Sequence, residues 1–364
     1  MSDDRHSAAA STGSHRRRTH ALLIIVAAGV LAITAAYALA RRFDDDGPNG
    51  RYLIGAWTFG ERTSLEAALD AGAIDEVSVD WLQSRADGSL AAPKLDDAFI
   101  ALAKDKGCRV VVTLTDYDQT THAFDAKISA AILASEQSRN AHATAVAEWC
   151  RLHEVAGVDV DWEAVKASHR EEFTAFVATL AEKLHADDRL IAVDVYPKTS
   201  EPGSWNGPQS QDWRRLGEIV DQFRIMTYNY SGSWSDPGPL SPPKWMDRVL
   251  DFAETQVAAE RIVAGIGFYG RDWHGSSTTD WVWANVIATR RDWTPRERRA
   301  VSRELRLDYE KDGQAHVAFF PDALAIRAKL DMLRSEHPDV QGVYAWLMGQ
   351  EDPAVWQELH TALR

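Results

Sequence analysis

The feature that most constrains the fold is an alternation, from residue 51 onward, of short apolar runs with segments of helical period. Eight runs have the length and composition of β-strands, at residues 52–57, 76–80, 109–114, 157–163, 190–196, 222–228, 261–268 and 342–346. Several, such as Val110-Val111-Val112, are continuously apolar, as expected of strands covered on both faces. Helical periodicity lies between them, at residues 64–73, 96–106, 141–155, 170–185, 244–258 and 323–335.

Eight strands alternating with helices predict an α/β fold, a (β/α)8 TIM barrel, whose active site is built at the carboxyl ends of the strands. A doubly wound sheet is the alternative, disfavoured because no glycine-rich phosphate loop follows the first strand. Residues 271–320 are too long for a barrel loop and predict a small α+β insertion after strand seven. We expect it to wall the cleft with a helix at 295–305 and a hairpin that joins 307–310 to 316–320 through Asp312-Gly313.

The first fifty residues have a different character. Residues 21–40 are twenty consecutive residues without a charge, preceded by Arg16, Arg17 and Arg18. A helix of this length can span a bilayer, and the arginines then orient its amino-terminal side towards the cytoplasm. The alternative is a signal peptide cleaved after Ala40, because Ala38-Leu39-Ala40 is a small-x-small site, which would release a secreted domain. The predicted organisation is a cytoplasmic tail (1–20), a transmembrane signal anchor (21–40), a linker (41–50) and an extracytoplasmic, membrane-anchored catalytic barrel (51–364).

The charge balance limits the possible partners. The net charge is −14, and the four Arg and two Asp of residues 1–40 leave −16 for residues 41–364. So acidic a domain is a poor nucleic-acid binder. It would not be held on an anionic polymer by charge either, which favours recognition through stacking and hydrogen bonds. Cys108 and Cys150 could form a disulfide in an oxidising compartment or remain buried thiols. No ligand spacing among the cysteines and the 12 histidines implies a metal, and no other cofactor is implied.

Residues 157–163, GVDVDWE, place carboxylates at every second position of a strand-like run. Alternate side chains of a strand share a face, so Asp159, Asp161 and Glu163 should converge. Repulsion and burial raise the pKa of at least one such acid, which keeps it protonated for use as a general acid. A solvated strand edge or a metal site is the alternative, although the interleaved valines and Trp162 argue against an exposed edge.

These residues resemble glycoside hydrolase family 18, the chitinase-like enzymes, whose strand-four signature ends in Asp-x-Asp-x-Glu. Further segments match the family in order at residues 226–229, 265–273 and 342–346. The later half is most similar to the bacterial spore-cortex and cell-wall branch, the peptidoglycan N-acetylglucosaminidases, in residues 238–239, 242–245 and 346–353. Ala156 and Asn229 depart from the pattern, which has Asp at both positions. Asn229 can orient a sugar group but cannot share a proton.

The resemblance implies substrate-assisted catalysis, in which the substrate's own N-acetyl oxygen attacks the anomeric carbon and configuration is retained. Glu163 would be the general acid and later the general base. Asp161 would hold the acetamide N–H, and Asp159 would tune Asp161 by sharing a proton. Tyr228 would donate to the acetamide oxygen, the alternative being an ordinary core tyrosine.

Aromatic side chains are the expected sugar platforms, since 14 Trp is a high number for this length. Trp346, at the end of strand eight, is expected to form the floor on which the sugar stacks. The other candidate binding residues are Asn229, Trp57, Trp81, Tyr269 and Trp273, with Tyr117 and Trp234 as further outer platforms.

The predicted function is hydrolysis of β-1,4 bonds next to N-acetylglucosamine, in peptidoglycan. A chitinase is the first alternative, because chitin carries the same 2-acetamido group. A sugar-binding barrel without turnover is the second, suggested by Ala156 and Asn229, and an inactive scaffold of a wall or sporulation complex is the third.

Overall fold

The computed structural model describes residues 52–91, 96–289 and 302–364. The predicted tail, membrane anchor and linker lie outside these ranges. Within them, none of the helices has the length and apolar character needed to cross a membrane.

Eight parallel strands form a closed barrel, which confirms the predicted (β/α)8 architecture. The hydrogen-bonded order is β1-β15-β10-β9-β8-β7-β4-β2, and pairing of β1 with β2 closes the ring. The bounds are Leu53–Thr58 (β1), Glu76–Ser84 (β2), Arg109–Thr115 (β4), Gly157–Asp161 (β7), Leu190–Val195 (β8), Gln222–Ile225 (β9), Ile262–Gly267 (β10) and Gly342–Trp346 (β15).

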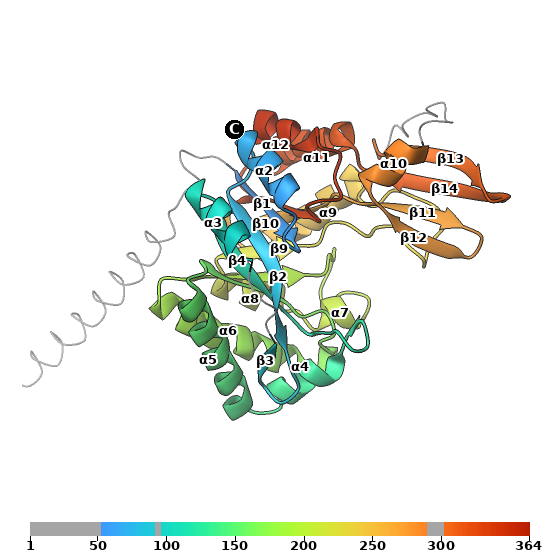
Figure 1. Ribbon diagram of the computed structural model, residues 1–364. Coiled ribbons are helices and arrows are strands. Elements are labelled where there is room, and N and C mark those ends of the chain that lie inside the picture. Colours follow the sequence, from blue (N-terminus) through green and yellow to red (C-terminus); the bar gives the residue numbers. More distant parts are fainter. Residues whose placement is uncertain (1–51, 92–95, 290–301) are drawn as a thin grey trace, which may run out of the picture. The chain divides into compact units, whose positions relative to one another are not determined.

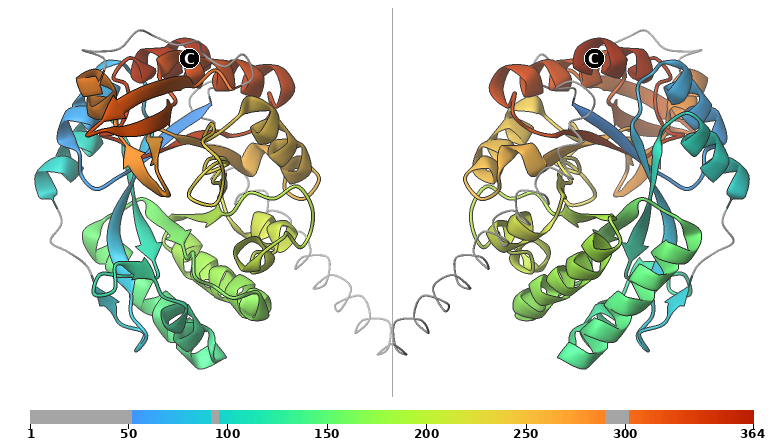
Figure 2. Two further views of the ribbon diagram at one scale, coloured as in Figure 1. Left: turned by 90° about the vertical axis from the view of Figure 1, so that its right-hand side faces the viewer. Right: turned by 90° about the vertical axis from the view of Figure 1, so that its left-hand side faces the viewer.

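Helices surround the barrel, as the views in Figures 1 and 2 show. They are α2 (Arg62–Asp70), α3 (Asp97–Asp105), α4 (Ala126–Leu133), α5 (Glu136–His153), α6 (Arg170–Ala186), α7 (Asn206–Gln209), α8 (Trp213–Ile219), α9 (Pro243–Glu254), α11 (Ala323–Glu336) and α12 (Val355–Leu363). Side-chain caps begin several of them: Asp96, Asp125, Asp212 and Asp322 each accept a backbone N–H of the first turn. Cys108 and Cys150 are both buried and free, so the thiol alternative holds in this structure.

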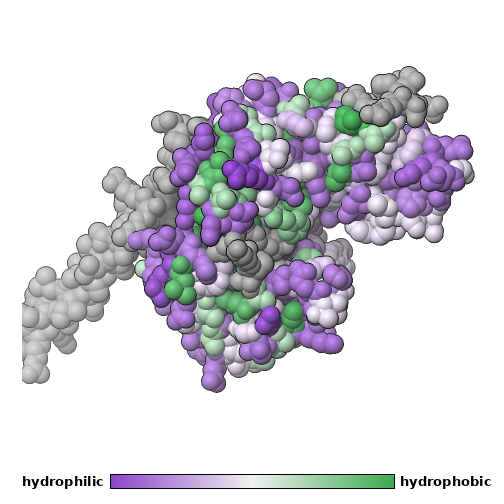
Figure 3. All heavy atoms as spheres, in the orientation of Figure 1, coloured by the Kyte–Doolittle hydropathy of each residue, from purple (hydrophilic) through white to green (hydrophobic). Residues whose placement is uncertain are grey.

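The insertion after β10 is an α+β unit, as predicted (Figure 1). Its antiparallel sheet has the order β12-β11-β14-β13. Its elements are β11 (Gly270–His274), β12 (Ser277–Trp281), α10 (Trp283–Thr289), β13 (Leu305–Lys311) and β14 (Gln314–Phe320). Trp281, Leu307 and Phe320 belong to a small core of its own. Hydrophilic residues cover its free end on the face seen in Figure 3.

The predicted hairpin is confirmed, because β13 and β14 pair around Asp312 and Gly313, both with positive φ. The predicted helix at 295–305 lies mostly outside the described residues. Its last part is wrong, since residues 302–304 are not helical and Leu305 begins β13. Leu305 alternates with Leu307 as a buried residue, which is the period of a strand and not of a helix.

Candidate active site

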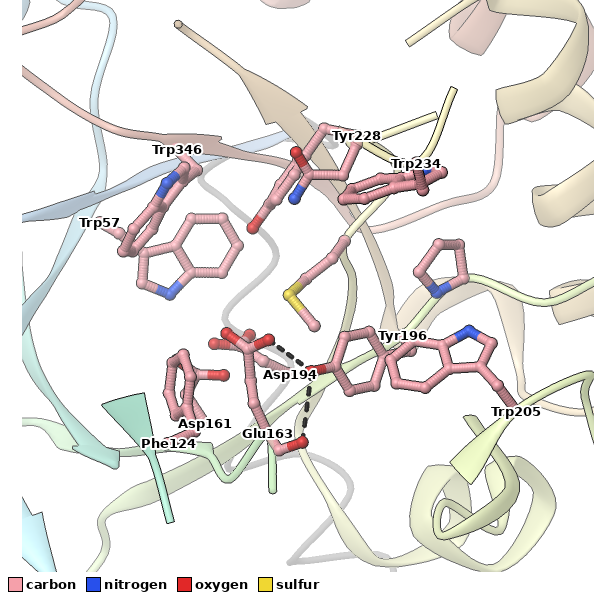
Figure 4. Close-up of a pocket in the computed structure, with 13 residues that line it drawn as sticks. Trp57, Phe124, Asp161, Glu163, Asp194, Tyr196, Trp205, Tyr228, Trp234 and Trp346 are labelled. Carbon is pink, nitrogen blue, oxygen red and sulfur yellow. Dashed lines mark hydrogen bonds between the residues drawn. The ribbon is translucent and has the colours of Figure 1, made fainter. Parts of the chain in front are cut away.

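The carboxyl ends of the barrel strands surround a pocket of about 760 Å³ (Figure 4). Trp57 reaches it from β1, Asp161 from β7, Asp194 from β8 and Trp346 from β15. This is the end of a TIM barrel at which active sites are found. The remaining lining residues are Phe124, Glu163, Tyr196, Pro197, Trp205, Met226, Tyr228, Asn229 and Trp234.

Glu163 lies two residues beyond the end of β7, where its carboxyl reaches the pocket. The Tyr196 hydroxyl donates to Glu163 Oε2 at 2.5 Å. The surrounding protein raises the pKa of Glu163 above its ordinary value by desolvation, and the hydrogen bond from Tyr196 opposes that rise. A carboxyl with a raised pKa that faces a pocket is suited to general acid chemistry.

Asp116 holds the backbone beneath this acid. Its two carboxylate oxygens accept the N–H groups of Glu163 and Ala164, at 3.0 and 3.2 Å. Asp116 is fully buried, and desolvation raises its pKa to about 7, against the effect of these hydrogen bonds. The segment that carries Glu163 is therefore fixed at both its side chain and its backbone.

Asp159 does not line the pocket, although the predicted three-acid face includes it. Its side chain is fully buried one layer deeper, where Trp57 Nε1 donates to Oδ2 at 2.7 Å and Ser78 Oγ does so at 3.0 Å. Arg224 Nη1 forms an ion pair with the same oxygen at 2.7 Å. Trp57 thus both lines the pocket and holds Asp159.

Two pocket residues on β8 and just after it were missed from the sequence: Asp194 and Tyr196. They occupy alternate positions at the end of a strand, as Asp159 and Asp161 do on β7, so the rule that identified the β7 acids would have found them. Asp194 is buried, and Figure 4 shows its carboxyl beside those of Asp161 and Glu163.

Tyr228 lines the pocket with its ring edge-on to Trp57, at a centroid distance of 6.5 Å. Desolvation raises the pKa of Tyr228 well above its ordinary value. The hydroxyl therefore remains protonated and available as a donor.

Asn229 has a left-handed backbone with φ of 63° and lines the pocket. Its Oδ1 accepts from Arg271 Nη2 at 3.2 Å and from the Tyr269 hydroxyl. Arg271 can only donate, so the oxygen of the Asn229 amide must face it, and the NH2 group is the part left to face the pocket.

The predicted aromatic platforms divide into two groups. Trp346, Trp57 and Trp234 line the pocket. Tyr269, Trp273 and Tyr117 do not: Tyr269 supports Asn229, Trp273 is buried against Phe319 and donates to Gly232 O at 3.2 Å, and Tyr117 packs on Phe124. The side chain of Trp81 lies outside the described part of the chain. Trp205, missed from the sequence, is 51% exposed and packs edge-on against Tyr196 at 4.5 Å.

A closed parallel barrel with a cluster of carboxyl groups and aromatic walls at its carboxyl-terminal mouth is typical of a glycan-processing TIM-barrel enzyme. The family model for glycosyl hydrolases family 18 matches residues 65–351. The chain belongs to this family, and it is a glycoside hydrolase.

Individual relatives agree with this assignment. A cortical fragment-lytic enzyme of Bacillus subtilis (strain 168) is 24% identical over 288 residues, which are 75% of this chain and 64% of that protein. The spore cortex-lytic enzyme SleL of Bacillus cereus superposes with a TM-score of 0.78 at 20% identity, over 86% of this chain and 74% of the other. A chitinase of Chromobacterium violaceum superposes with a TM-score of 0.77 at 23% identity, over 86% and 99%. At these identities the two structures show the shared fold.

Proposed function

We propose that this glycosidase cleaves β-1,4 bonds next to N-acetylglucosamine, in peptidoglycan and with net retention, on the outer side of the membrane. The observation that carries the proposal is the position of Glu163, held by Tyr196 at the pocket mouth beside Asp161 and opposite Trp346 (Figure 4). One protonated acid is sufficient when the substrate supplies its own nucleophile.

The catalytic cycle assigns one task to each group. A sugar stacked on Trp346 presents its 2-acetamido oxygen to its own anomeric carbon, with the Tyr228 hydroxyl donating to that oxygen. Glu163 gives its proton to the leaving glycosidic oxygen as the bond to the anomeric carbon breaks. Asp161 accepts the acetamide N–H and balances the positive charge of the cyclic oxazolinium. Water then attacks the anomeric carbon and gives a proton to Glu163, which restores the acid.

The preference for peptidoglycan rests on similarity and on the rim of the pocket. The cortical fragment-lytic enzyme and SleL, both similar to this chain, are named for the spore cortex. Trp205 and Trp234 are 51% and 66% exposed, so the rim presents stacking surfaces that are open to solvent. An open rim leaves space for the lactyl-peptide branches that chitin lacks. Chitin is the second candidate substrate, because chitinases share the fold.

Product mass spectrometry tests the reaction. We expect the wild-type chain to release fragments ending in reducing N-acetylglucosamine from purified peptidoglycan, and Glu163→Gln to lose at least a thousandfold in rate, because the amide has no proton to give. Glu136→Gln, a matched change on the exposed first turn of α5, should leave the rate unchanged. Chitin oligosaccharides incubated in parallel decide between the substrates. Equal sugar binding by wild type and Glu163→Gln with no cleavage of either substrate would favour the sugar-binding alternative.

A further inference from the structure

Arg224, on β9, is fully buried inside the barrel. Its Nη1 is paired with Asp159 at 2.7 Å and its Nη2 with Glu76 Oε1 at 2.7 Å. Its Nε and Nη2 also donate to Gln222 Oε1, at 2.9 and 2.7 Å. The guanidinium is therefore already shared between two carboxylates.

These contacts surround one carboxylate oxygen of Asp159 with donors. Its Oδ2 receives the Trp57 indole N–H, the Ser78 hydroxyl and the Arg224 guanidinium. Two hydrogen-bond donors and one cation therefore meet on a single buried oxygen, which acts as an acceptor. Asp159 is consequently poorly placed to carry the proton that the resemblance assigns to it.

Asp194 lies on the same face of the adjacent strand β8, two residues beyond Ala192, which is the register partner of Asp159. It pairs in register with Arg224 across β8 and β9, it is 3% exposed, and it lines the pocket. Among the described residues, no donor reaches Asp194 Oδ1 or Asp159 Oδ1, and both atoms are buried. Two adjacent buried carboxylates with unsatisfied oxygens would repel each other in a medium of low dielectric, whereas one proton between them turns the repulsion into a hydrogen bond.

We propose that Asp194 is a positioning residue that remains a neutral carboxylic acid, donates its proton to Asp159, and so leaves Asp161 ionised at the floor of the pocket. The proposal rests on the proposed function for its catalytic meaning. In a substrate-assisted reaction an anionic Asp161 balances the positive charge of the oxazolinium. Because Asp194 donates its proton to Asp159, Asp159 and Asp161 do not have to share one.

The electrostatic surroundings support the protonated form. Burial raises the pKa of Asp194 most, followed by the charge of Asp159, while Arg224 opposes the rise. The charge of Glu163 raises it further. Asp161 and Glu163 lie beside Asp194 in the same pocket, and Tyr228, which follows β9, has a hydroxyl whose pKa desolvation raises well above its ordinary value.

Infrared spectroscopy tests the protonation directly, without reference to catalysis. We expect the purified full chain, labelled with 13C-aspartate, to show a label-sensitive protonated-carboxyl band at pH 9, well above the pKa of about 7 of Asp116. Asp194→Asn should abolish this band, and Asp187→Asn, at an exposed position beyond α6, should retain it. Absence of the band from the wild-type chain would overturn the proposal even if the Asp194 variant failed to fold.

The pH profile of kcat/KM gives the second readout. A neutral Asp194 carries no charge for the amide to remove, so Asp194→Asn should keep the alkaline limb of kcat/KM at the same pH as in the wild-type chain. If Asp194 were ionised, the amide would remove a negative charge near Glu163 and lower the pKa of Glu163. The alkaline limb of kcat/KM would then move by about one unit to lower pH. That result would contradict the proposal. A wild-type chain that cleaves no substrate would refute the proposed function and leave the infrared result standing.

Discussion

At the scale of single residues, the hydrogen bond from Tyr196 to Glu163 has a defined electrostatic consequence. The hydroxyl stabilises the ionised carboxylate more than the protonated acid, so it lowers the pKa of Glu163 against the rise caused by burial. Two opposed effects therefore act on the pKa of Glu163, and the hydroxyl oxygen of Tyr196 supplies one of them.

Tyr196→Phe removes that oxygen and preserves the ring that packs on Trp205. Loss of a hydrogen bond to a charged group, about 1.5 kcal/mol, should raise the pKa of Glu163 by about one unit. The acid then stays protonated to higher pH, so the alkaline limb of kcat/KM should move upward by the same amount. Tyr230→Phe is the matched control, because Tyr230 is 47% exposed and lies outside the pocket lining. If the alkaline limb of the Tyr196→Phe variant stays at the same pH or moves to lower pH, the hydrogen bond does not lower the pKa of Glu163.

The sequence predicted individual residues best where periodicity alone was sufficient. Alternation on β7 identified Asp161 and Glu163, both of which line the pocket. It could not show that Asp159 lies one layer deeper, because that depends on Arg224 from β9, which is remote along the chain. Trp273 was predicted to bind sugar for a similar reason. Its burial against Phe319 arises from the fold of the insertion, and no pattern in the neighbouring sequence indicates it.

At the scale of elements, a buried charge cluster fastens the insertion to the barrel. Glu304, immediately before β13, is fully buried, and its carboxylate accepts the backbone N–H groups of Leu240 and Ser241 at 2.8 and 3.0 Å. It also pairs with Lys329 of α11 at 3.1 Å. One side chain therefore connects the inserted sheet, the loop that follows β9, and a barrel helix.

Glu304→Gln should destabilise the protein by about 3 kcal/mol, because it leaves the Lys329 ammonium buried without its counter-charge. Urea unfolding measures the loss, and amide hydrogen exchange at Leu240 and Ser241 should accelerate. The double variant Glu304→Gln/Lys329→Met should be more stable than the sum of its single variants, since it removes both charges together. A loss below about 0.5 kcal/mol, or additive single changes, would show that the pair is not energetically coupled.

Elements with strong local signals were predicted, and those without them were not. The barrel strands have apolar runs, and the hairpin has Asp312-Gly313, which suits the positive φ of its turn. The strands β11 and β12 were missed because β12 is largely exposed and polar, and its pairing with β11 depends on the tertiary fold. Predicted β7 and β9 run past their observed ends because apolar and aromatic residues continue into the loops that form the pocket.

At the scale of the whole molecule, the regular alternation of strands and helices was sufficient to predict a barrel, because a chain with this pattern has few ways to bury both faces of a parallel sheet. The same alternation does not predict the substrate. The 2-acetamido chemistry is common to peptidoglycan and chitin, so it does not separate the two substrates, and the rim residues Trp205 and Trp234 lie outside the barrel strands, in loops.

The whole-molecule prediction concerns residues 21–40, outside the described residues. We expect them to anchor the full chain in a bilayer, because twenty uncharged residues span about 30 Å as a helix and follow three arginines. The barrel offers no electrostatic substitute, since residues 41–364 carry a net charge of −16 and anionic membranes would repel them.

Fractionation of a bacterial host that expresses the full chain checks this expectation. The intact chain should remain with membranes after a carbonate wash and dissolve in detergent, whereas the fragment 51–364 should be recovered without detergent. Intact mass separates the two interpretations of the apolar segment: an anchor retains residues 1–40, and a signal peptide yields a mature chain beginning at Arg41. A chain released by carbonate with residues 1–40 still attached would contradict both, and would make the barrel's access to an external glycan the next point to explain.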